Sequence, residues 1–130
     1  MQTLQPKGWP QPRGFAHGIV AEGKQVFVAG QIGQTPDEQV PPGFGAQTRQ
    51  ALLNTQVILA EAGATPQQIV RMTWFVTDKR DYLAAGKEIG AAWKEVLGAH
   101  FPAITLVEVK SLLNDDAKIE IESTAVIPSR

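Results

Sequence analysis

The sequence predicts a single α+β domain in which one β-sheet carries two helices on one of its faces. Segments rich in β-branched and aromatic residues alternate with two segments of helical periodicity in the order ββαβαββ, and no internal repeat interrupts them. A length of 130 residues suffices for one hydrophobic core, and 43% hydrophobic with 19% charged residues is typical of a folded protein. We therefore expect one domain over residues 1–130.

The N-terminal part is predicted to be irregular at first and then to form a hairpin. Residues 1–13 contain three prolines, which favours an extended arm. The β-rich runs 19–20 and 26–29 flank a glycine-bearing turn at 22–24, which predicts a β-hairpin. Residues 33–45 are rich in proline and glycine and predict a loop of the kind that often borders a site.

Two helices follow from apolar residues spaced three or four apart. The first is expected over residues 46–62, before Gly63, and its predicted buried stripe is Ala46, Gln50, Leu53, Val57 and Ala60. The second is expected to extend to Gly98, and its predicted stripe is Tyr82, Gly86, Ile89, Trp93 and Val96.

Three further strands are predicted at residues 69–76, 105–109 and 118–127, and the first of them is apolar on both faces. Two helices cover only one face of a sheet, so we expect part of this apolar surface to be buried by self-association. The residues on which this expectation rests are Met72, Trp74, Val76 and Ile121.

Composition excludes several classes of function. A net charge of −1 and scattered cations disfavour nucleic acid as a partner, because phosphate binding typically uses about 6–10 basic contacts. With no cysteine and two histidines, we expect no metal site. The sequence has no apolar segment of membrane-spanning length or leader-like segment, so we expect no membrane partner and a cytoplasmic location.

Several motifs resemble the Rid family, also called the YjgF or reactive intermediate deaminase family, in order and spacing. The resemblance covers most of residues 14–126, and its motifs are Gly14–Val20, Val26–Ile32, Ala46–Leu52, Thr73–Asp78, Pro102-Ala103, Val107–Val109 and Ile119–Glu122.

The resemblance implies a chorismate-mutase-like fold and a homotrimer with a central β-barrel. It also implies small-molecule sites at the subunit interfaces and a cofactor-independent hydrolysis of enamines or imines that releases ammonia.

The resemblance also locates candidate site residues, and two of them depart from the family. Ile104 stands where the family has the arginine that binds the substrate carboxylate, and Leu106 stands where many members have cysteine. The pair either packs structurally or lines a pocket for a less anionic ligand. Glu120 matches the carboxylate that activates water, although a solvated or ion-paired glutamate is the alternative.

The other candidates are substrate-binding residues. Phe15 replaces a common tyrosine, and His17 is either structural or an acid–base group. Residues 29–31, which are Ala29, Gly30 and Gln31, resemble the cleft loop, although Gly30 also suits a β-bulge. Arg71 either replaces the missing anion anchor or pairs with a strand glutamate, and Arg13 is a further candidate anchor.

The leading hypothesis is therefore a Rid-type hydrolase of a reactive enamine or imine other than a simple α-imino acid, with Glu120 directing water. The alternative is a trimeric protein that binds a small metabolite without turnover. Endoribonuclease activity, which is sometimes attached to the family, is a minor alternative that the charge balance disfavours.

Overall fold

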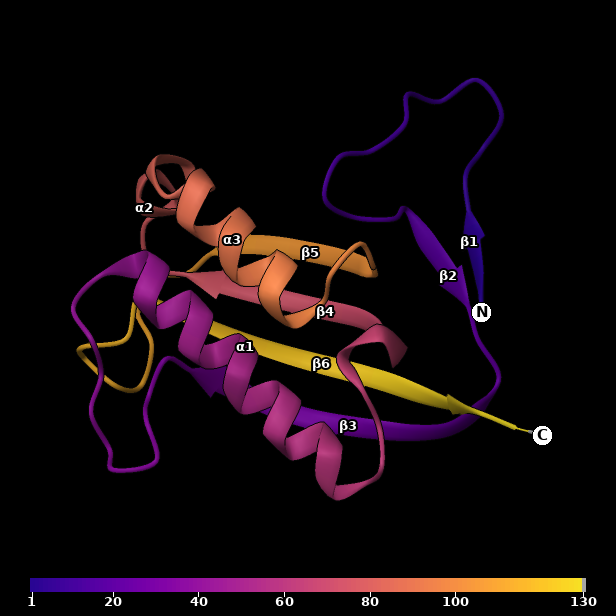
Figure 1. The fold of residues 1–130 in the computed structure, drawn as a ribbon. Coiled ribbons are helices and arrows are strands. Elements are labelled where there is room, and N and C mark those ends of the chain that lie inside the picture. Colours follow the sequence, from indigo (N-terminus) through magenta and orange to yellow (C-terminus); the bar gives the residue numbers. More distant parts are fainter. Residues whose placement is uncertain (130) are drawn as a thin grey trace.

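The computed structural model describes residues 1–129 as an α+β fold with a mixed four-stranded sheet (Figure 1). The strands lie in the order β3-β6-β4-β5, with β4 and β5 parallel and the other pairs antiparallel. Their bounds are β3 Gly23–Ile32, β4 Ile69–Val76, β5 Ala103–Glu108 and β6 Ile119–Pro128. The strand predicted at 69–76 is confirmed at both ends.

Both long helices, α1 (Phe44–Glu61) and α3 (Gly86–Val96), cover the same face of this sheet, as predicted (Figure 1). The second predicted helix is in fact two helices, because the short α2 (Lys79–Ala84) ends before α3 begins. Asp78 starts α2 by accepting a hydrogen bond from the Arg80 backbone N–H at 2.9 Å. A 3₁₀ turn, η1 (Pro66–Gln68), precedes β4. No helix within residues 1–129 has the length and apolar character that crossing a membrane requires.

The stripe predicted for α1 was wrong, because the helix buries a different face. Val57, which belonged to the predicted stripe, is 67% exposed. The buried face includes the polar residues Gln47, Thr48 and Thr55. The two threonine hydroxyls donate to backbone carbonyls one turn earlier in the helix. The Gln47 side-chain amide donates to backbone carbonyls of two loops, and its oxygen accepts from the backbone N–H of the residue before β6. Polar groups that are satisfied internally can be buried, and apolar spacing alone does not show this.

The predicted N-terminal hairpin was also wrong. β2 (Gly18–Val20) pairs with β1 (Gln2–Leu4) in a separate two-stranded sheet, so the start of the predicted extended arm is a strand. β3 pairs with β6 instead. Gly23 has a φ of +146° and lies so close to the Ile127 backbone that a Cβ would collide with it. This glycine therefore permits close packing at the end of β6 and does not form a hairpin turn.

The residues that suggested self-association lie beneath the helices. Met72, Trp74, Val76 and Ile121 are all buried, since alternation along β4 and the pairing of Trp74 with Ile121 place them on the helix-covered face. The argument for an oligomer from these four residues is therefore wrong. The opposite face, here called the open face, mixes polar residues with aromatic ones, and its Phe27 is 73% exposed.

Candidate functional site

A cavity of about 1060 Å³ lies on the helix-covered side of the sheet, beside the edge strand β5. Strands β4 and β5, helices α2 and α3, and residues 13–15 all contribute to its walls. We call it the aromatic cavity, because its lining includes Phe15, Trp74, Tyr82, Trp93 and Phe101. Its size is at the upper end of the range that small-molecule sites usually have.

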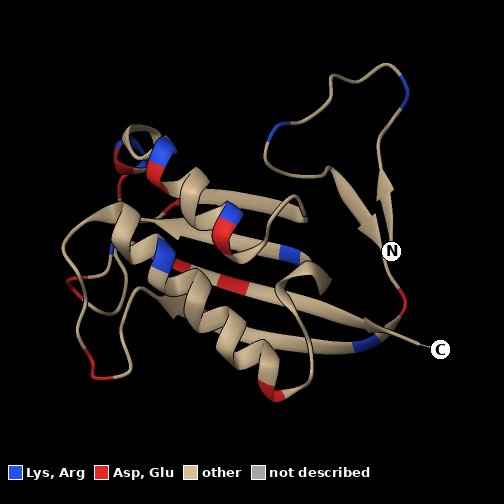
Figure 2. Cartoon of the chain, in the orientation of Figure 1, with Lys and Arg blue, Asp and Glu red and all other residues tan. Residues whose placement is uncertain are grey.

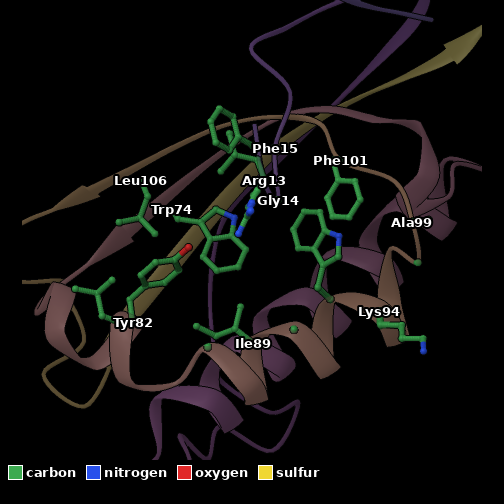
Figure 3. A pocket seen from close by; sticks show the side chains of 16 residues that line it. Arg13, Gly14, Phe15, Trp74, Tyr82, Ile89, Lys94, Ala99, Phe101 and Leu106 are labelled. Carbon is green, nitrogen blue, oxygen red and sulfur yellow. The ribbon is translucent and has the colours of Figure 1, made fainter. Parts of the chain in front are cut away.

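The aromatic rings of this cavity are packed against one another. Trp74 meets Tyr82 edge to face with 6.3 Å between ring centroids, and it meets Trp93 at 6.1 Å with a tilt of 41°. Trp93 lies parallel to Phe101 at 6.0 Å. In Figure 3, Tyr82 and Leu106 lie at one end of the cavity and Phe101 at the other, with Trp74 between them. The wall is thus broad, apolar and fixed by its own packing.

Trp74 contributes an unpaired hydrogen-bond donor to this wall. The residue is only 3% exposed, and its indole Nε1 has no hydrogen-bond partner among the described residues. Trp93 differs, because its Nε1–H donates to the His100 carbonyl at 3.1 Å. A buried donor without a partner typically costs about 1–3 kcal/mol. The nitrogen itself has almost no accessible surface, so this donor stays unpaired inside the packed wall.

The N-terminal segment is held against β5, and this places Arg13 and Phe15 at the cavity. Ala16 donates its backbone N–H to the Pro102 carbonyl at 2.9 Å and forms a parallel bridge with Ala103. Phe15 consequently lines the aromatic cavity together with Ile104. Arg13 and Lys94 are the charged residues among those that line it, and both are exposed at the surface.

A second cavity of about 650 Å³ is lined by Phe15, His17, Arg71 and Ile104 together with residues of the open face. The His17 ring meets the Phe15 ring edge-on at 5.4 Å and the Trp9 ring edge-on at 5.0 Å. The structure thus brings four of the predicted binding residues together here. Phe15 and Ile104 line both cavities, whereas Leu106 lines only the aromatic one.

Glu120 lies elsewhere, with the three residues of the predicted cleft loop. The β3–β6 register shifts between Val28 and Gln31, so Ala29 and Gly30 form a β-bulge. The Glu120 side chain lies against Gly30, where a Cβ would collide with its carboxylate oxygen. Gln31 donates its side-chain amide to the Ala29 carbonyl at 3.1 Å. We call Glu120 with Ala29, Gly30 and Gln31 the carboxylate cluster, and neither cavity includes it.

Strand register separates Glu120 from Ile104 within one chain. Ile104 pairs with Met72, whereas Glu120 pairs with Phe75, three residues further along β4. Because side chains alternate between faces, Ile104 faces the helices and Glu120 the open face. The offset is about 10 Å along the strands and about 10 Å across them.

The candidate anion anchors Arg13 and Arg71 have no carboxylate partner among residues 1–129, so the glutamate pairing considered for Arg71 is absent. The two salt bridges of these residues join Arg49 to Glu95 and Arg80 to Asp78, each at 2.8 Å. The guanidinium in each pair lowers the pKa of its carboxylic acid by hydrogen bonding. Arg13 and Arg71 lie at different cavities.

Sequence reasoning missed the residues that form most of the aromatic cavity. Tyr82, Ile89 and Trp93 were interpreted only as the core stripe of a helix, and Trp74 only as part of an uncovered sheet face. The available signal was the concentration of large aromatic residues near Ile104 in the second half of the chain, where Trp74, Tyr82, Trp93 and Phe101 all lie.

The chain is thus an α+β domain with a cavity of small-molecule size beside the edge strand β5. The sequence profile of the family described as Endoribonuclease L-PSP matches residues 10–127. The chain therefore belongs to this family, which includes the RutC, YjgF and Rid proteins.

Individual relatives agree with this assignment. A RutC family protein of Haemophilus influenzae is 40% identical over 105 residues, which are 80% of each chain. The 2-iminobutanoate/2-iminopropanoate deaminase of Escherichia coli is 39% identical over 105 residues, again 80% of each chain. The crystal structure of the Rid family protein YyfB from Yersinia pestis matches with a TM-score of 0.82 and 29% identity, covering 97% of this chain and 98% of that one.

Proposed function

We propose that this protein is a cofactor-independent hydrolase that converts a reactive enamine or imine into a carbonyl compound and ammonia. The observation that carries the proposal is the placement of Glu120, whose carboxylate lies over Gly30 in the bulge of β3. Relatives named as 2-iminobutanoate/2-iminopropanoate deaminase support the reaction class.

Glu120 would serve as both acid and base. Its protonated form gives a proton to the enamine carbon, which yields an iminium ion and the carboxylate. The carboxylate then takes a proton from water as the water oxygen bonds to the iminium carbon, which forms a carbinolamine. The hydroxyl proton moves to nitrogen, the C–N bond breaks, and a carbonyl compound and ammonia leave. The net reaction consumes one water and needs no oxidant or metal.

The proposed substrate is not a simple α-imino acid held by its carboxylate. Ile104 offers neither a charge nor a pair of donors, and it packs against the core beside Leu106. A carboxylate at this position would be desolvated without a partner, which is unfavourable.

We further propose that the site is completed by a second copy of the chain, in a homotrimer whose open faces form a central β-barrel. In one chain the aromatic cavity and Glu120 lie on opposite faces of the sheet, so a substrate in the cavity cannot reach that chain's carboxylate. Phe27, exposed on the open face, would be covered in such an assembly. Light scattering should give about three times the chain mass of 14.1 kDa, and a monomer would contradict this proposal.

The activity is tested by ammonia release from a panel of neutral, aromatic and aliphatic enamines, each generated in situ. We expect at least one neutral or aromatic compound to be hydrolysed faster than its background rate, with the acceleration lost in Glu120→Gln. Unchanged ammonia release across the panel and across pH would overturn the proposal.

The second candidate is a small-molecule binding protein without turnover, which the separation of Glu120 from the aromatic cavity favours. In that case a cavity ligand should raise the melting temperature of the protein, because binding to the native state alone is sufficient for this. Glu120→Ala would then alter no rate, since no ammonia release would be measurable from any panel compound.

Nucleic acid cleavage has no comparable support. Figure 2 shows Lys and Arg separated along the described chain, with Asp and Glu interspersed, and no continuous basic stripe. RNA binding that depends on phosphate contacts weakens steeply with salt. The absence of RNA binding even at low salt would exclude this activity.

A further inference from the structure

We propose that the second cavity binds a small phosphomonoester, with the phosphate group held by Arg71 and the organic part lying against the apolar side chains of the cavity. This cavity lies at the open face of the sheet, whereas the aromatic cavity lies on the helix-covered side. The inference goes beyond the proposed function, because it needs neither Glu120 nor turnover.

Arg71 supplies the positive charge of the second cavity. It is the one Lys or Arg among the described residues that line this cavity, and no acidic residue is among them. Glu122 lies one row along the open face, opposite Thr73, but it forms no ion pair with Arg71 within residues 1–129. A guanidinium without a carboxylate partner can give two parallel hydrogen bonds to a phosphate. The charge of the cavity thus favours an oxyanion.

Strand register gathers further hydrogen-bond donors around Arg71. This residue pairs with Thr124 of β6 on one side and with Ala103 of β5 on the other, and Thr105 lies two residues beyond Ala103 on the same face. The side chains of Arg71, Thr105 and Thr124 make no hydrogen bond to another residue of the described chain. All three can therefore donate to a ligand.

The number of these donors favours a phosphate group over a carboxylate. A carboxylate has two oxygens in one plane, and the guanidinium alone can occupy both. The phosphate of a monoester has three terminal oxygens that point in different directions, so one remains for the hydroxyls of β5 and β6. One arginine also suits a single phosphate group, whereas a nucleic acid typically needs about 6–10 basic contacts.

The remaining lining indicates a small apolar or aromatic body. Phe15, Phe27 and Ile104 are among the lining residues, and the volume of about 650 Å³ is within the range of small-molecule sites. The His17 ring meets the Trp9 and Phe15 rings edge-on at 5.0 and 5.4 Å. This ring carries an N–H donor in either tautomer, so it can add a polar contact beside the aromatic ones.

The proposed homotrimer leaves room for this ligand. If the open faces line a central barrel, three sheets of four strands give a barrel of twelve strands. A barrel of about eight strands is just wide enough for side chains or one small ligand, and the diameter grows with strand number. The residues of the proposed site come from one chain, so binding does not require the trimer.

Calorimetric titration of the purified full-length protein with three probes tests the proposed ligand class. Phenyl phosphate has both the ring and the phosphate, phenylacetate has the ring with a planar carboxylate, and inorganic phosphate lacks the ring. Phenyl phosphate should bind at least about tenfold more tightly than either of the others, which corresponds to about 1.4 kcal/mol. Equal affinities for phenyl phosphate and phenylacetate, or no binding of phenyl phosphate, would overturn the inference. Equal affinities for phenyl phosphate and inorganic phosphate would overturn the role of the apolar walls.

Substitution of Arg71 tests the charged contact. Arg71→Gln should weaken phenyl phosphate binding at least about tenfold and make the remaining affinity less sensitive to salt. Arg71→Lys keeps the charge without the planar fork, so its affinity should be intermediate. Arg80→Gln, outside both cavities, is the matched control and should bind normally. Loss of binding in Arg13→Gln, with Arg71→Gln unaffected, would place the phosphate at the aromatic cavity and overturn the inference.

Substitution of Thr124 tests the hydroxyl contact. Thr124→Val removes the hydroxyl and keeps a side chain of similar shape, so it should weaken phenyl phosphate binding about 3-fold to 10-fold. Thr73→Val, one row along the open face and outside the second cavity, is the matched control and should bind normally. Equal phenyl phosphate affinities of these two variants would overturn the role of Thr124.

Binding and turnover separate this inference from the proposed function. Glu120→Gln should bind phenyl phosphate normally, because Glu120 lines neither cavity. Phenyl phosphate binding without ammonia release from any enamine would support the inference and overturn the proposed hydrolase. Ammonia release without phenyl phosphate binding would support the hydrolase and overturn the inference.

Discussion

The aromatic cavity and the carboxylate cluster differ in almost every physical respect. The cavity is large, apolar and covered by α2 and α3, and the Trp74 indole N–H in its wall has no hydrogen-bond partner among the described residues. The carboxylate cluster lies on the open face and places one side chain, Glu120, against a glycine in a β-bulge. One region has a binding volume without a candidate acid–base carboxylate, and the other has the carboxylate without a cavity.

In the proposed enzyme, a single chain would therefore hold two separate half-sites. The register of β4 with its two neighbours offsets the rows of Ile104 and Glu120 by three residues, an odd number, which assigns them to opposite faces. A change in rotamer cannot bring the two together. The proposed chemistry therefore requires the cavity of one copy to meet the carboxylate cluster of another.

The largest expected effect is on turnover at Glu120. Glu120→Gln should lower kcat for the best enamine substrate by about 10² to 10⁴, because positioned proton transfer contributes about that much. Glu122→Gln, two residues along on the same face of β6, is the control and should keep its activity. Full activity in Glu120→Gln would show that the carboxylate cluster is not catalytic.

The next effect would change substrate choice at the cavity. Ile104→Arg should increase the hydrolysis of 2-iminobutanoate by about 10-fold to 100-fold, since a hydrogen bond to a charged group contributes about 1.5–3 kcal/mol. Ile104→Met supplies length without charge and should not increase it. Ammonia release from imine generated in situ measures both variants. The same rate in Ile104→Arg and Ile104→Met would contradict the assignment of position 104 to carboxylate binding.

A smaller effect should follow from Gly30→Ala, measured as turnover of the best enamine substrate. An added Cβ would collide with the Glu120 carboxylate, which ends a flexible side chain and can move to another rotamer at little cost in stability. The displaced carboxylate should lower turnover, whereas the free energy of unfolding in urea should change little. Gly43→Ala, whose new Cβ would meet no atom within 4 Å, should keep the parent turnover. Equal turnover of the two variants would contradict the close packing of Glu120 on Gly30.

The smallest effect should come from Arg49→Gln, which removes the ion pair between α1 and α3, the two helices that cover the sheet. Arg49 lowers the pKa of Glu95, so the stabilisation is present above the ordinary glutamate value of 4.5. It is lost as the pH falls below that value. Thermal unfolding should therefore show a slight destabilisation at pH 7 that disappears in acid, and a difference independent of pH would contradict this account.

Much of the fold could be predicted because local sequence and tertiary structure agree. β4 is β-rich over its whole length, and its bounds of 69–76 are those expected from sequence. The prediction of a β2–β3 hairpin was wrong because the close contact of Gly23 with Ile127 depends on residues far apart in the chain. The predicted buried stripe of α1 was wrong because Gln47 can be buried when its side-chain amide is hydrogen-bonded to distant loops.

The site was less predictable than the fold. Motif matching proposed Phe15, Ile104, Leu106 and Glu120 as site residues, but it could not show which of them share a face of the sheet, because that depends on the register between strands. A β-bulge was one of two interpretations of Gly30 from the sequence, and the other was close approach by a ligand. The structure contains the bulge, with the Glu120 side chain packed closely against the glycine. No sequence pattern around Trp74 indicates that its indole N–H lacks a hydrogen-bond partner, because that depends on tertiary packing.

The most direct test of the shared site is complementation between two inactive variants. Glu120→Gln removes the carboxylate, and Gly90→Trp fills the aromatic cavity from α3 at a position where an added Cβ meets no atom within 4 Å. Each variant alone should keep at most about 1% of the parent activity. If they are unfolded together and refolded as mixed trimers, about a quarter of the interfaces should combine an intact cavity with an intact Glu120, restoring about that share of activity. Mixed trimers with no more activity than either parent would contradict a site built from two chains.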